Sequence, residues 1–406
     1  MQSIFYIKHL YKGHTSYSFK QKISIRYIFC LLIMVLAITS CSKEVEAADR
    51  LGKSKAVEEE STEPGEERYF IREQIVKVKY GPNAPVTVFL VYLDDGLSQK
   101  GIDNCLEGMK RFNDQGLMFQ LKRTTDRKKA HISAILTEPS KINNFFAKTQ
   151  YARRGMPGKT IKLNSTLYGA QNPELPTNMA SVFAHELGHA FGFVHIDYKD
   201  NKFSCHNLAY TEKMKVPVRA VFGTVTSKPV DNSFMLACIN RKDNRPFLLL
   251  DKIGVYNVYG RYKDEGLPFI KYKGENGYSN YFTADYNELG EGNENYKPEG
   301  MVGRIYIKNT PTDSRIPLAY YFNPKTRDHF YTTVLSQLGM GKDDYEFIRL
   351  YFIYPKSKGN SRVPLVRFFS KDKQQHFHTT DITEAYKLQK DKSWKYEGVI
   401  GYLTAL

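Results

Sequence analysis

Long apolar runs are scarce in this sequence, which limits how the chain can meet a membrane. The run from Tyr27 to Ile38 is shorter than the about 20 residues that a spanning helix needs. The first forty residues contain no acidic side chain, and several lysines and arginines precede the run. This pattern is typical of an export signal, so residues 1–40 are predicted to be a cleaved signal peptide rather than an anchor helix.

Cysteine is also scarce for an exported chain. Cys41 ends an Ile-Thr-Ser-Cys segment that resembles the bacterial lipobox. The resemblance implies that Cys41 becomes the lipidated first residue of a lipoprotein at the outer membrane or cell surface; an unlipidated cysteine in a plain signal is the alternative. Beyond this point only Cys105, Cys205 and Cys238 remain, and three thiols cannot all pair.

Acidic residues are outnumbered, since 59 lysines and arginines stand against 43 aspartates and glutamates, for a net charge of +16. Residues 41–68 run against this trend, with an acidic surplus and few large apolar side chains, and are predicted to be a disordered tether. The basic remainder could attract acidic polysaccharide, anionic lipid or acidic protein, with solubility alone as the alternative. No nucleic-acid-binding motif accompanies the charge, and no nucleic-acid partner is expected.

The most informative pattern is His185-Glu186-Leu187-Gly188-His189-Ala190-Phe191-Gly192-Phe193-Val194-His195. Two histidines four residues apart lie on one face of a helix, so both imidazoles can bind one ion. Gly192 permits the left-handed conformation that ends a helix, and the reversed chain can bring His195 back as a third ligand. With Glu186 beside them, the pattern predicts a hydrolase with one catalytic Zn²⁺. An ordinary helix with two surface histidines is the alternative.

The longer pattern also predicts a methionine turn downstream. The candidate is Asn232-Ser233-Phe234-Met235-Leu236-Ala237-Cys238, in which Met235 could place its thioether under the histidines; taken alone, Met235 would be plain core. A disulfide between Cys205 and Cys238 would tie the loop after the third ligand to this turn, and buried free thiols are the alternative. Asp197 could orient a histidine or cap a turn.

These segments resemble the bacterial metzincins called dual-action HEIGH metallopeptidases. The resemblance covers about residues 69–260, within a predicted metallopeptidase domain of residues 69–262. It is carried by the histidine segment through Tyr198, by Phe222-Gly223-Thr224, by the methionine turn and by Asp251-Lys252-Ile253-Gly254-Val255-Tyr256. Leu187 replaces the isoleucine of the family name. The resemblance implies a zinc-dependent endopeptidase with Glu186 as general base and with three zinc ligands: His185, His189 and His195.

In such a site three neutral imidazoles leave zinc its positive charge, which lowers the pKa of a bound water to about 7. Glu186 would take the proton of that water and deliver it to the leaving amine. Some metzincins hold a tyrosine two residues after the turn methionine, where it helps to stabilise the intermediate. Ala237 stands there in this chain, so that helper is absent.

Apolar alternation ahead of the zinc helix predicts a mixed sheet and hence an α+β, metzincin-like fold. Strands are predicted over residues 86–92, 118–121, 131–136 and 160–163, with helices near residues 102–112 and 249–259. The segment Tyr151-Ala152-Arg153-Arg154 falls where metzincins place the sheet edge above the cleft, and a strand there would bind peptide by strand addition. Arg153 and Arg154 would favour acidic substrates or, alternatively, only block aggregation.

Residues 263–406 contain a threefold repeat. Pro268, Pro317 and Pro364 each begin an apolar strand, at spacings of 49 and 47 residues, and an aromatic segment follows each strand. Three such units predict an all-β pseudo-threefold domain, most simply a β-trefoil. The units resemble short repeats, marked by Tyr-Asn-Pro and His-Phe-Tyr-Thr-Thr, of secreted bacterial hydrolases, and a glycan or cell-surface ligand is the implied partner. The recurring aromatics, His329 and His376 are more simply explained as core and hydrogen-bonded groups.

Together these patterns predict an exported, lipid-anchored zinc endopeptidase that acts on protein or peptide substrates and carries a β-repeat targeting module. One alternative is a non-catalytic, glycan-binding surface adhesin with a vestigial zinc site. Retention of Glu186 argues against it, because a purely structural site needs no base. Another alternative, a peptidoglycan peptide hydrolase, shares the chemistry and differs only in its substrate.

Overall fold

The computed structural model describes residues 70–406, except 73–74, 82, 144, 173, 200, 207–216, 222–223, 225–229, 262–265, 309–313 and 360. The predicted signal peptide, the predicted lipidation site Cys41 and the predicted tether of residues 41–68 lie outside the described residues. Among the described helices, none combines the length and the apolar character needed to cross a membrane.

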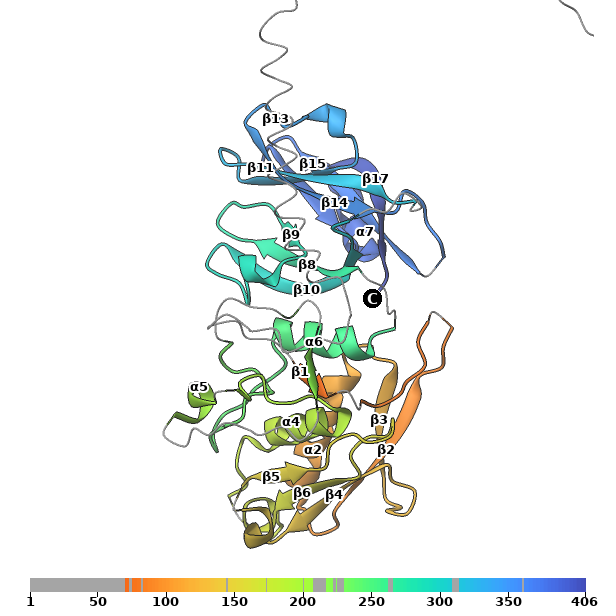
Figure 1. The fold of residues 1–406 in the computed structure, drawn as a ribbon. Coiled ribbons are helices and arrows are strands. Elements are labelled where there is room, and N and C mark those ends of the chain that lie inside the picture. The colour runs from red at the N-terminus through yellow and green to blue at the C-terminus, as the bar shows by residue number, and fades with distance from the viewer. Residues whose placement is uncertain are drawn as a thin grey trace, which may run out of the picture. The chain divides into compact units, whose positions relative to one another are not determined.

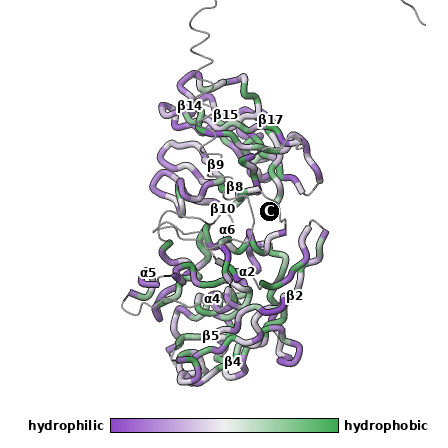
Figure 2. Tube along the Cα trace, in the orientation of Figure 1, coloured by the Kyte–Doolittle hydropathy of each residue, from purple (hydrophilic) through white to green (hydrophobic). Residues whose placement is uncertain are grey.

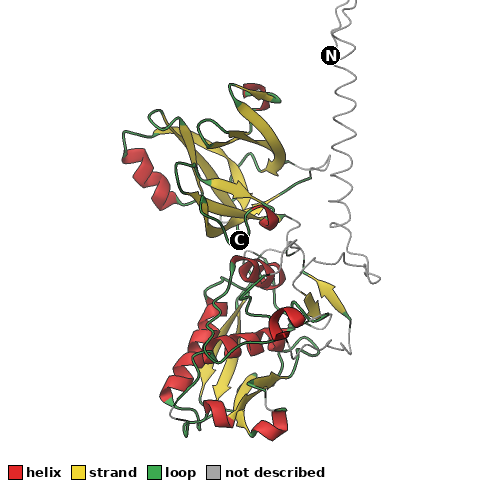
Figure 3. Ribbon diagram, turned by 90° about the vertical axis from the view of Figure 1, so that its left-hand side faces the viewer, coloured by secondary structure: helices red, strands yellow, loops and turns green. Residues whose placement is uncertain are grey.

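The first domain contains both helices and strands (Figure 1; Figure 3). Its elements are β1 (Phe70–Arg72), β2 (Thr87–Leu93), α2 (Gln99–Asn113), β3 (Phe119–Thr124), β4 (Ile132–Thr137), η1 (Pro139–Ile142), β5 (Ala147–Thr149), β6 (Thr160–Asn164), α3 (Ser165–Tyr168), α4 (Met179–Phe191), α5 (Lys202–Cys205), β7 (Val218–Ala220) and α6 (Leu249–Tyr259).

A five-stranded mixed sheet forms the base of this domain, in the order β3-β2-β4-β6-β5. Its strands are parallel except for β5, which pairs antiparallel with β6 at one edge. The predicted α+β class with a mixed sheet is confirmed, and four of its strands were expected from apolar alternation. The edge strand β5 ends at Thr149, whereas Arg153 and Met156 form a tight turn just beyond it.

Aromatic packing joins the helix α4 to this sheet. The ring of Phe191, in the last turn of α4, stacks on Phe119 of β3 at a centroid distance of 4.1 Å. Phe89 of β2 meets the same ring edge-on at 5.5 Å. Phe112 of α2 also stacks on Phe191, at 6.2 Å. Since all four side chains are buried, they fix the end of α4, and with it the position of the histidine segment.

The second domain consists mainly of strands (Figure 3). Its elements are β8 (Leu267–Gly274), β9 (Tyr281–Thr283), η3 (Tyr286–Glu288), β10 (Tyr296–Ile305), β11 (Ile316–Asn323), β12 (Asp328–Thr332), η4 (Leu335–Gln337), β13 (Gly341–Lys342), β14 (Tyr345–Ile353), β15 (Arg362–Ser370), β16 (Gln375–Thr379), α7 (Ile382–Lys390) and β17 (Lys395–Thr404). Hydrophobic residues recur along its strands and along α6 of the first domain (Figure 2).

The three sequence repeats form three antiparallel units with one strand order. In each unit the first strand lies between the second and the third, as β9-β8-β10, β12-β11-β14 and β16-β15-β17. The third strands of the units meet pairwise, at Arg304 and Thr404, Tyr306 and Phe352, and Tyr354 and Tyr402. The all-β, threefold-repeated character is therefore confirmed, while closure as a β-trefoil stays a prediction.

Equivalent residues of the three second strands meet in the interior of this domain. Phe282, Tyr331 and His378 are buried, and their ring centroids lie 5.0–6.4 Å apart. The Tyr331 hydroxyl donates a hydrogen bond to the Phe282 carbonyl. We call these three residues the axis cluster. The repeated aromatics at this position are thus core residues.

The two histidines of the repeat motif are hydrogen-bonded in the structure. His329 contacts the hydroxyls of Tyr296 and Tyr320 at 2.6 and 2.8 Å. His376 places its Nδ1 2.6 Å from a carboxylate oxygen of Asp328. Neither histidine belongs to a group of side chains spaced to hold a metal ion in the described part of the chain.

Candidate metal centre

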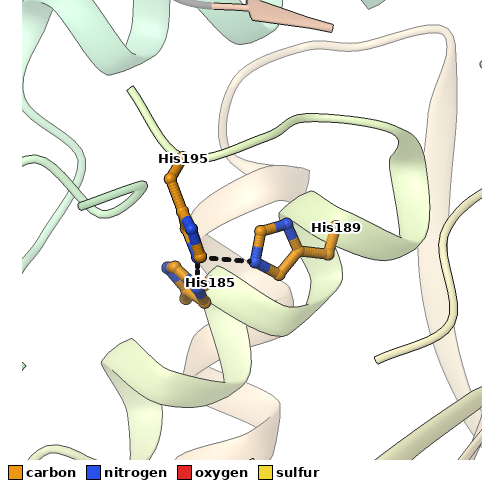
Figure 4. Close-up of side chains that lie close together, drawn as sticks. All are labelled: His185, His189 and His195. Atoms are coloured by element: carbon orange, nitrogen blue, oxygen red, sulfur yellow. Dashed lines mark hydrogen bonds between the residues drawn. The ribbon is translucent and has the colours of Figure 1, made fainter. Parts of the chain in front are cut away.

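The helix α4 and the turn after it bring three histidines together. His185 and His189 lie one turn apart on α4. Gly192 caps the helix in a left-handed conformation, with a φ of 107°, and its N–H reaches the carbonyls of Gly188 and His189. This reversal is the one that a glycine permits, and it returns the chain so that His195 faces the helix (Figure 4).

The three Nε2 atoms converge on one point. The Nε2 atom of His195 lies 3.1 Å from that of His189 and 3.2 Å from that of His185. Two nitrogens bound to one tetrahedral zinc at about 2.0–2.1 Å would lie about 3.3 Å apart. The spacing of the imidazoles therefore fits a single zinc ion.

Backbone carbonyls orient two of the rings by contacting the ring nitrogen that does not face the metal position. The Nδ1 atom of His185 lies 2.7 Å from the carbonyl of Phe234, and that of His189 lies 2.9 Å from the carbonyl of Phe193. A carbonyl accepts only from a protonated nitrogen, so both rings carry their proton on Nδ1 and present the Nε2 lone pair to the metal position. Burial, together with the charges of the other two histidines, lowers the pKa of His185 well below its ordinary value, which favours the neutral ligand form.

Met235 lies against the helix that carries the histidines. Its side chain is fully buried, and a Cβ built on Gly188 would come within 2.5 Å of its Sδ atom. The Met235 carbonyl accepts a hydrogen bond from the N–H of Ile196, next to the third histidine. The turn is therefore in contact with α4 and with the segment of His195, where the sequence placed it.

Asp251 of α6 is hydrogen-bonded to the methionine turn. It is fully buried, and its carboxylate accepts hydrogen bonds from the Ser233 hydroxyl at 2.7 Å and from the N–H of Phe234 at 3.3 Å. It also accepts from the N–H of Leu248 at the start of α6. Because the Phe234 carbonyl faces His185, Asp251 is connected to the His185 ring through the backbone of Phe234.

Three links tie the segment after His195 to the same turn. Asp197 accepts hydrogen bonds from the Ala237 N–H and from the Ser204 hydroxyl. Ser204 in turn accepts from the N–H of Cys238. A disulfide joins Cys205 to Cys238, whereas Cys105 is a buried free thiol. Within the described residues Asp197 bonds to no histidine, so it positions the turn and not a ring.

Glu186 lies beside the histidines and is 6% exposed. Burial raises the pKa of its carboxyl to about 7, and the nearby hydroxyl of Thr149, on the edge strand, opposes that rise. Its second oxygen, Oε2, has no hydrogen-bond partner among the described residues. One carboxylate oxygen is thus left to accept a proton, next to the strand at the sheet edge.

Tyr151, two residues beyond the edge strand, covers one of the imidazoles. Its ring meets that of His189 edge-on at a centroid distance of 5.0 Å, and the Arg72 guanidinium lies 4.4 Å above it. Arg153 and Arg154 are exposed on the following turn. The predicted edge segment therefore divides into an aromatic residue at the site and two basic residues that face solvent.

Comparison with known proteins agrees with this geometry. Residues 72–259 match the family model of the dual-action HEIGH metallo-peptidases. This domain belongs to that family. It is therefore the domain of a zinc metalloendopeptidase, as the histidine pattern predicted. Residues 268–404 match a domain of unknown function, and no curated protein matches the chain.

Two solved structures show a distant likeness to part of this chain. Myroilysin is 13% identical, with a TM-score of 0.33, and the match covers 48% of this chain and 99% of that chain. High choriolytic enzyme 1, a hatching-enzyme zinc protease from the medaka fish Oryzias latipes, is 15% identical, with a TM-score of 0.27, over 46% and 94% of the two chains.

The sequence pattern did not reveal every residue that builds the site. Thr149 lies on a strand of three residues, which is too short to show a pattern of alternating apolar residues. Asp251 was noted only as part of the segment 251–256 that resembles the family, and no role was predicted for it. The carbonyls of Phe193 and Phe234 act through the backbone, which leaves no side-chain signal. Each of these groups acts because the fold brings it to the histidines.

Proposed function

We propose that this protein is an exported zinc endopeptidase in which His185, His189 and His195 bind one zinc ion and Glu186 is the general base. The observation that carries the proposal is the convergence of three Nε2 atoms, in which that of His195 lies 3.1 and 3.2 Å from the other two. Beside them lies a buried carboxylate with one oxygen that has no partner among the described residues. A structural zinc site has no use for such a carboxylate.

In this proposal the histidines, the backbone carbonyls and Glu186 have separate roles in peptide hydrolysis. The three imidazoles hold the metal, and the carbonyls behind two of them keep their Nε2 atoms turned inward. When bound, zinc supplies Lewis acidity toward the scissile carbonyl and the attacking water. Glu186 accepts the proton of that water and passes it to the leaving amine, a transfer worth on the order of 100- to 10,000-fold in rate. Ala237 adds no donor for the developing oxyanion.

The peptide substrate would lie along the edge strand β5, next to the zinc position. β5 pairs with β6 on one side only, so its other backbone groups face outward and can pair with an extended peptide. Thr149 at the end of β5 lies close enough to Glu186 to lower the pKa of its carboxyl. A peptide held on this strand would therefore bring a backbone carbonyl close to the general base.

Export and lipid attachment are part of the same proposal. The basic, apolar leader of residues 1–40 and the lipobox-like segment ending at Cys41 support them. The disulfide between Cys205 and Cys238 adds support, because such bonds persist in oxidising compartments. Mass spectrometry of the mature protein tests this: a diacylated N-terminal Cys41 is expected, and an intact leader would contradict it.

For the repeat domain we propose a targeting module that closes as a β-trefoil and binds a glycan or another cell-surface ligand. The end-to-end contacts of the third strands and the axis cluster support a threefold closure. Binding of the purified chain to glycan arrays and to bacterial cell walls tests the ligand, and an absence of binding to both would contradict the targeting role.

The central experiment compares residues 69–406 with the variant Glu186→Gln. Both proteins are expected to bind one zinc, while cleavage of a mixed peptide library falls on the order of 100- to 10,000-fold in the variant. Glu138→Gln, a change at a carboxylate that is 68% exposed, is the matched control and is expected to behave as the parent. Bound zinc without cleavage that depends on Glu186 would refute the enzyme.

A further inference from the structure

Lys148, the middle residue of the edge strand β5, faces away from the helix that carries the histidines. β5 lies at the edge of the catalytic sheet, beside β6, and packs against α4. Ala147, its first residue, is buried, whereas Lys148 is exposed. Because neighbouring residues of a strand point to opposite faces, Ala147 and Thr149 share the α4 side of the sheet and Lys148 lies on the solvent side.

A second lysine lies directly opposite Lys148 in the sheet. Lys162 of β6 is its partner in the antiparallel register, so the two side chains lie on the same face with their Cβ atoms about 5 Å apart. Like charges at that spacing destabilise a sheet. Neither lysine has an ion-pair partner among the described residues. The pair therefore leaves two positive charges uncompensated beside the open edge of the sheet.

The sequence around this pair is basic throughout. Residues 139–173, which include β5 and β6, contain six lysines and arginines and no aspartate or glutamate. In the described part of the chain only Lys141 of these six forms an ion pair, with Glu138. Arg153 and Arg154 are exposed on the turn after β5. The segment that borders the proposed peptide path is therefore positively charged, with no acidic side chain of its own.

The hydrogen bonds of β5 show which of its residues can pair with a peptide. The N–H of Gln150 donates to the carbonyl of Thr160 at 3.1 Å, and the N–H of Asn164 donates to that of Phe146 at 3.0 Å. Hydrogen-bonded pairs alternate along antiparallel strands, so Lys148, midway between these two pairs, also turns its backbone to β6. Its neighbours on both sides consequently turn their N–H and C=O groups to the open edge.

We propose that Lys148 is a specificity-determining residue that binds an acidic side chain of the peptide substrate. The inference rests on the proposed peptidase function and on strand addition at β5. In an antiparallel peptide that bonds to Ala147 and Thr149, the residue opposite Lys148 forms a non-hydrogen-bonded pair, in which the Cα atoms are about 4.5 Å apart and the side chains come closest. An aspartate or glutamate there meets Lys148, with Lys162 one strand further.

The test begins with the peptide that the zinc-loaded protein cleaves best in a mixed library. Glutamate, glutamine or lysine is placed at each position in turn, and the cleavage site is mapped by mass spectrometry. At one position kcat/KM should be about 2- to 5-fold higher with glutamate than with glutamine, as for an exposed cross-strand ion pair. The two adjacent positions point to the α4 side and should show no such preference. High salt should reduce the ratio toward one.

Charge reversal at Lys148 gives the decisive comparison. Lys148→Glu should prefer lysine over glutamate at the same peptide position, and its thermal unfolding should be unchanged or raised, because an ion pair with Lys162 replaces a like-charge pair. Lys122→Glu is the matched control, since Lys122 is an exposed lysine of β3 at the opposite edge of the same sheet. It should keep the preference of the parent.

Three results would overturn the assignment: no preference for glutamate in the parent, an unchanged preference in Lys148→Glu, or an equal change in Lys122→Glu. Lysine at a sheet edge also discourages aggregation, and a lysine with that role alone would give the first of these results.

Binding without turnover separates this inference from the peptidase proposal. In the zinc-loaded Glu186→Gln protein, fluorescence anisotropy should show about 2- to 5-fold tighter binding of the glutamate peptide than of its glutamine partner. Adding Lys148→Glu should reverse the order. Such binding beside an inactive parent would refute the peptidase but not the acidic-peptide site. Cleavage without any preference for acidic peptides would refute only the acidic-peptide site.

Discussion

Gly188 lies between the two helical histidines of the proposed zinc site, where a side chain has no room. Glycine in the interior of a helix is ordinarily less favourable than alanine by about 1 kcal/mol. Here an added Cβ would lie 2.5 Å from the Met235 Sδ atom and 3.1 Å from the ring of Phe234. Since Met235 is fully buried, its thioether cannot move aside without displacing neighbours. The glycine thus allows the methionine turn to touch the helix.

Replacing Gly188 with alanine is therefore expected to destabilise the domain by about 1–3 kcal/mol and to weaken zinc binding. Urea unfolding and competition for zinc against a chelator measure the two effects. Gly101→Ala in α2 is the matched control, because its Cβ would make only ordinary contacts, 3.4 Å or more. The control should be neutral or slightly stabilising. Equal effects of both substitutions would contradict a specific contact with Met235.

His329 makes the repeat domain sensitive to acid. Burial lowers the pKa of this histidine to about 3, whereas an exposed histidine in the unfolded chain titrates near 6.5. The unfolded chain therefore binds more protons between these values, and stability falls as the pH drops from 6.5 toward 3. At pH 5 the loss from this one group is about 2 kcal/mol relative to neutral pH.

His329→Asn should remove that share of the acid sensitivity. Asparagine is chosen because Asn280 holds the equivalent position of the first repeat, which shows that the fold accommodates it. Urea unfolding of the parent and the variant at pH 7.5 and pH 5 gives the comparison. The difference in the free energy of unfolding between parent and variant should shrink by about 2 kcal/mol from pH 7.5 to pH 5. A constant difference would show that the pKa of His329 is the same in the folded and the unfolded protein.

At the scale of the elements, the loop after α4 and the methionine turn are joined by the disulfide between Cys205 and Cys238. The two cysteines are 33 residues apart. A cross-link that closes a loop of that length reduces the entropy of the unfolded chain and thereby stabilises the folded state by about 3–4 kcal/mol. The double variant Cys205→Ser, Cys238→Ser should lose about that much stability and bind zinc less tightly. Cys105→Ser, at a buried free thiol, is the comparison, and zinc affinity there should be unchanged.

The secondary structure was predictable where the sequence alternates over several residues. β2, with Phe89, Val91 and Leu93 buried on one face, and the helix α6 both follow from their apolar spacing. The strand β5 was not predictable, because three residues carry no period, and its position comes from pairing with β6. Element boundaries were set by caps such as Ser98, whose side chain accepts from the N–H of Gly101.

The metal centre was more predictable than its surroundings for a physical reason. The four-residue spacing and the terminal glycine of α4 place the histidines by local geometry alone. Asp251 lies 66 residues after His185 in sequence, and the donors that its carboxylate accepts from depend on tertiary contacts. No local pattern contains that information, so only the folded chain reveals it.

At the scale of the whole molecule, a glutamate of the repeat domain caps the last helix of the catalytic domain. Glu291 accepts hydrogen bonds from the N–H groups of Leu249 and Leu250, at 3.0 and 3.2 Å. These groups belong to the first turn of α6, where backbone donors lack partners within the helix. Because Asp251 in the same turn is hydrogen-bonded to the methionine turn, the repeat domain is linked through α6 to the proposed zinc site.

Glu291→Ala is expected to destabilise α6 by about 1 kcal/mol, as for the loss of a helix cap. Hydrogen exchange should then speed up in the first turn of α6, with a small drop in zinc affinity. Glu294→Ala, which changes a nearby glutamate, serves as the control and should leave exchange in α6 as it was. Unaltered exchange in Glu291→Ala would show that the cap does not hold the helix.

At the axis cluster the three units of the repeat domain are not interchangeable. Phe282, Tyr331 and His378 occupy one position of the three repeated units, yet only the tyrosine donates a hydroxyl hydrogen bond to a neighbouring carbonyl. A chain built from three copies of the second unit would bring three phenol groups to the same point, with more volume and more hydroxyls to satisfy. Each unit is therefore specific to its position in the domain. Exchanging one unit for another should lower the stability of the repeat domain even where the strands of the two units align.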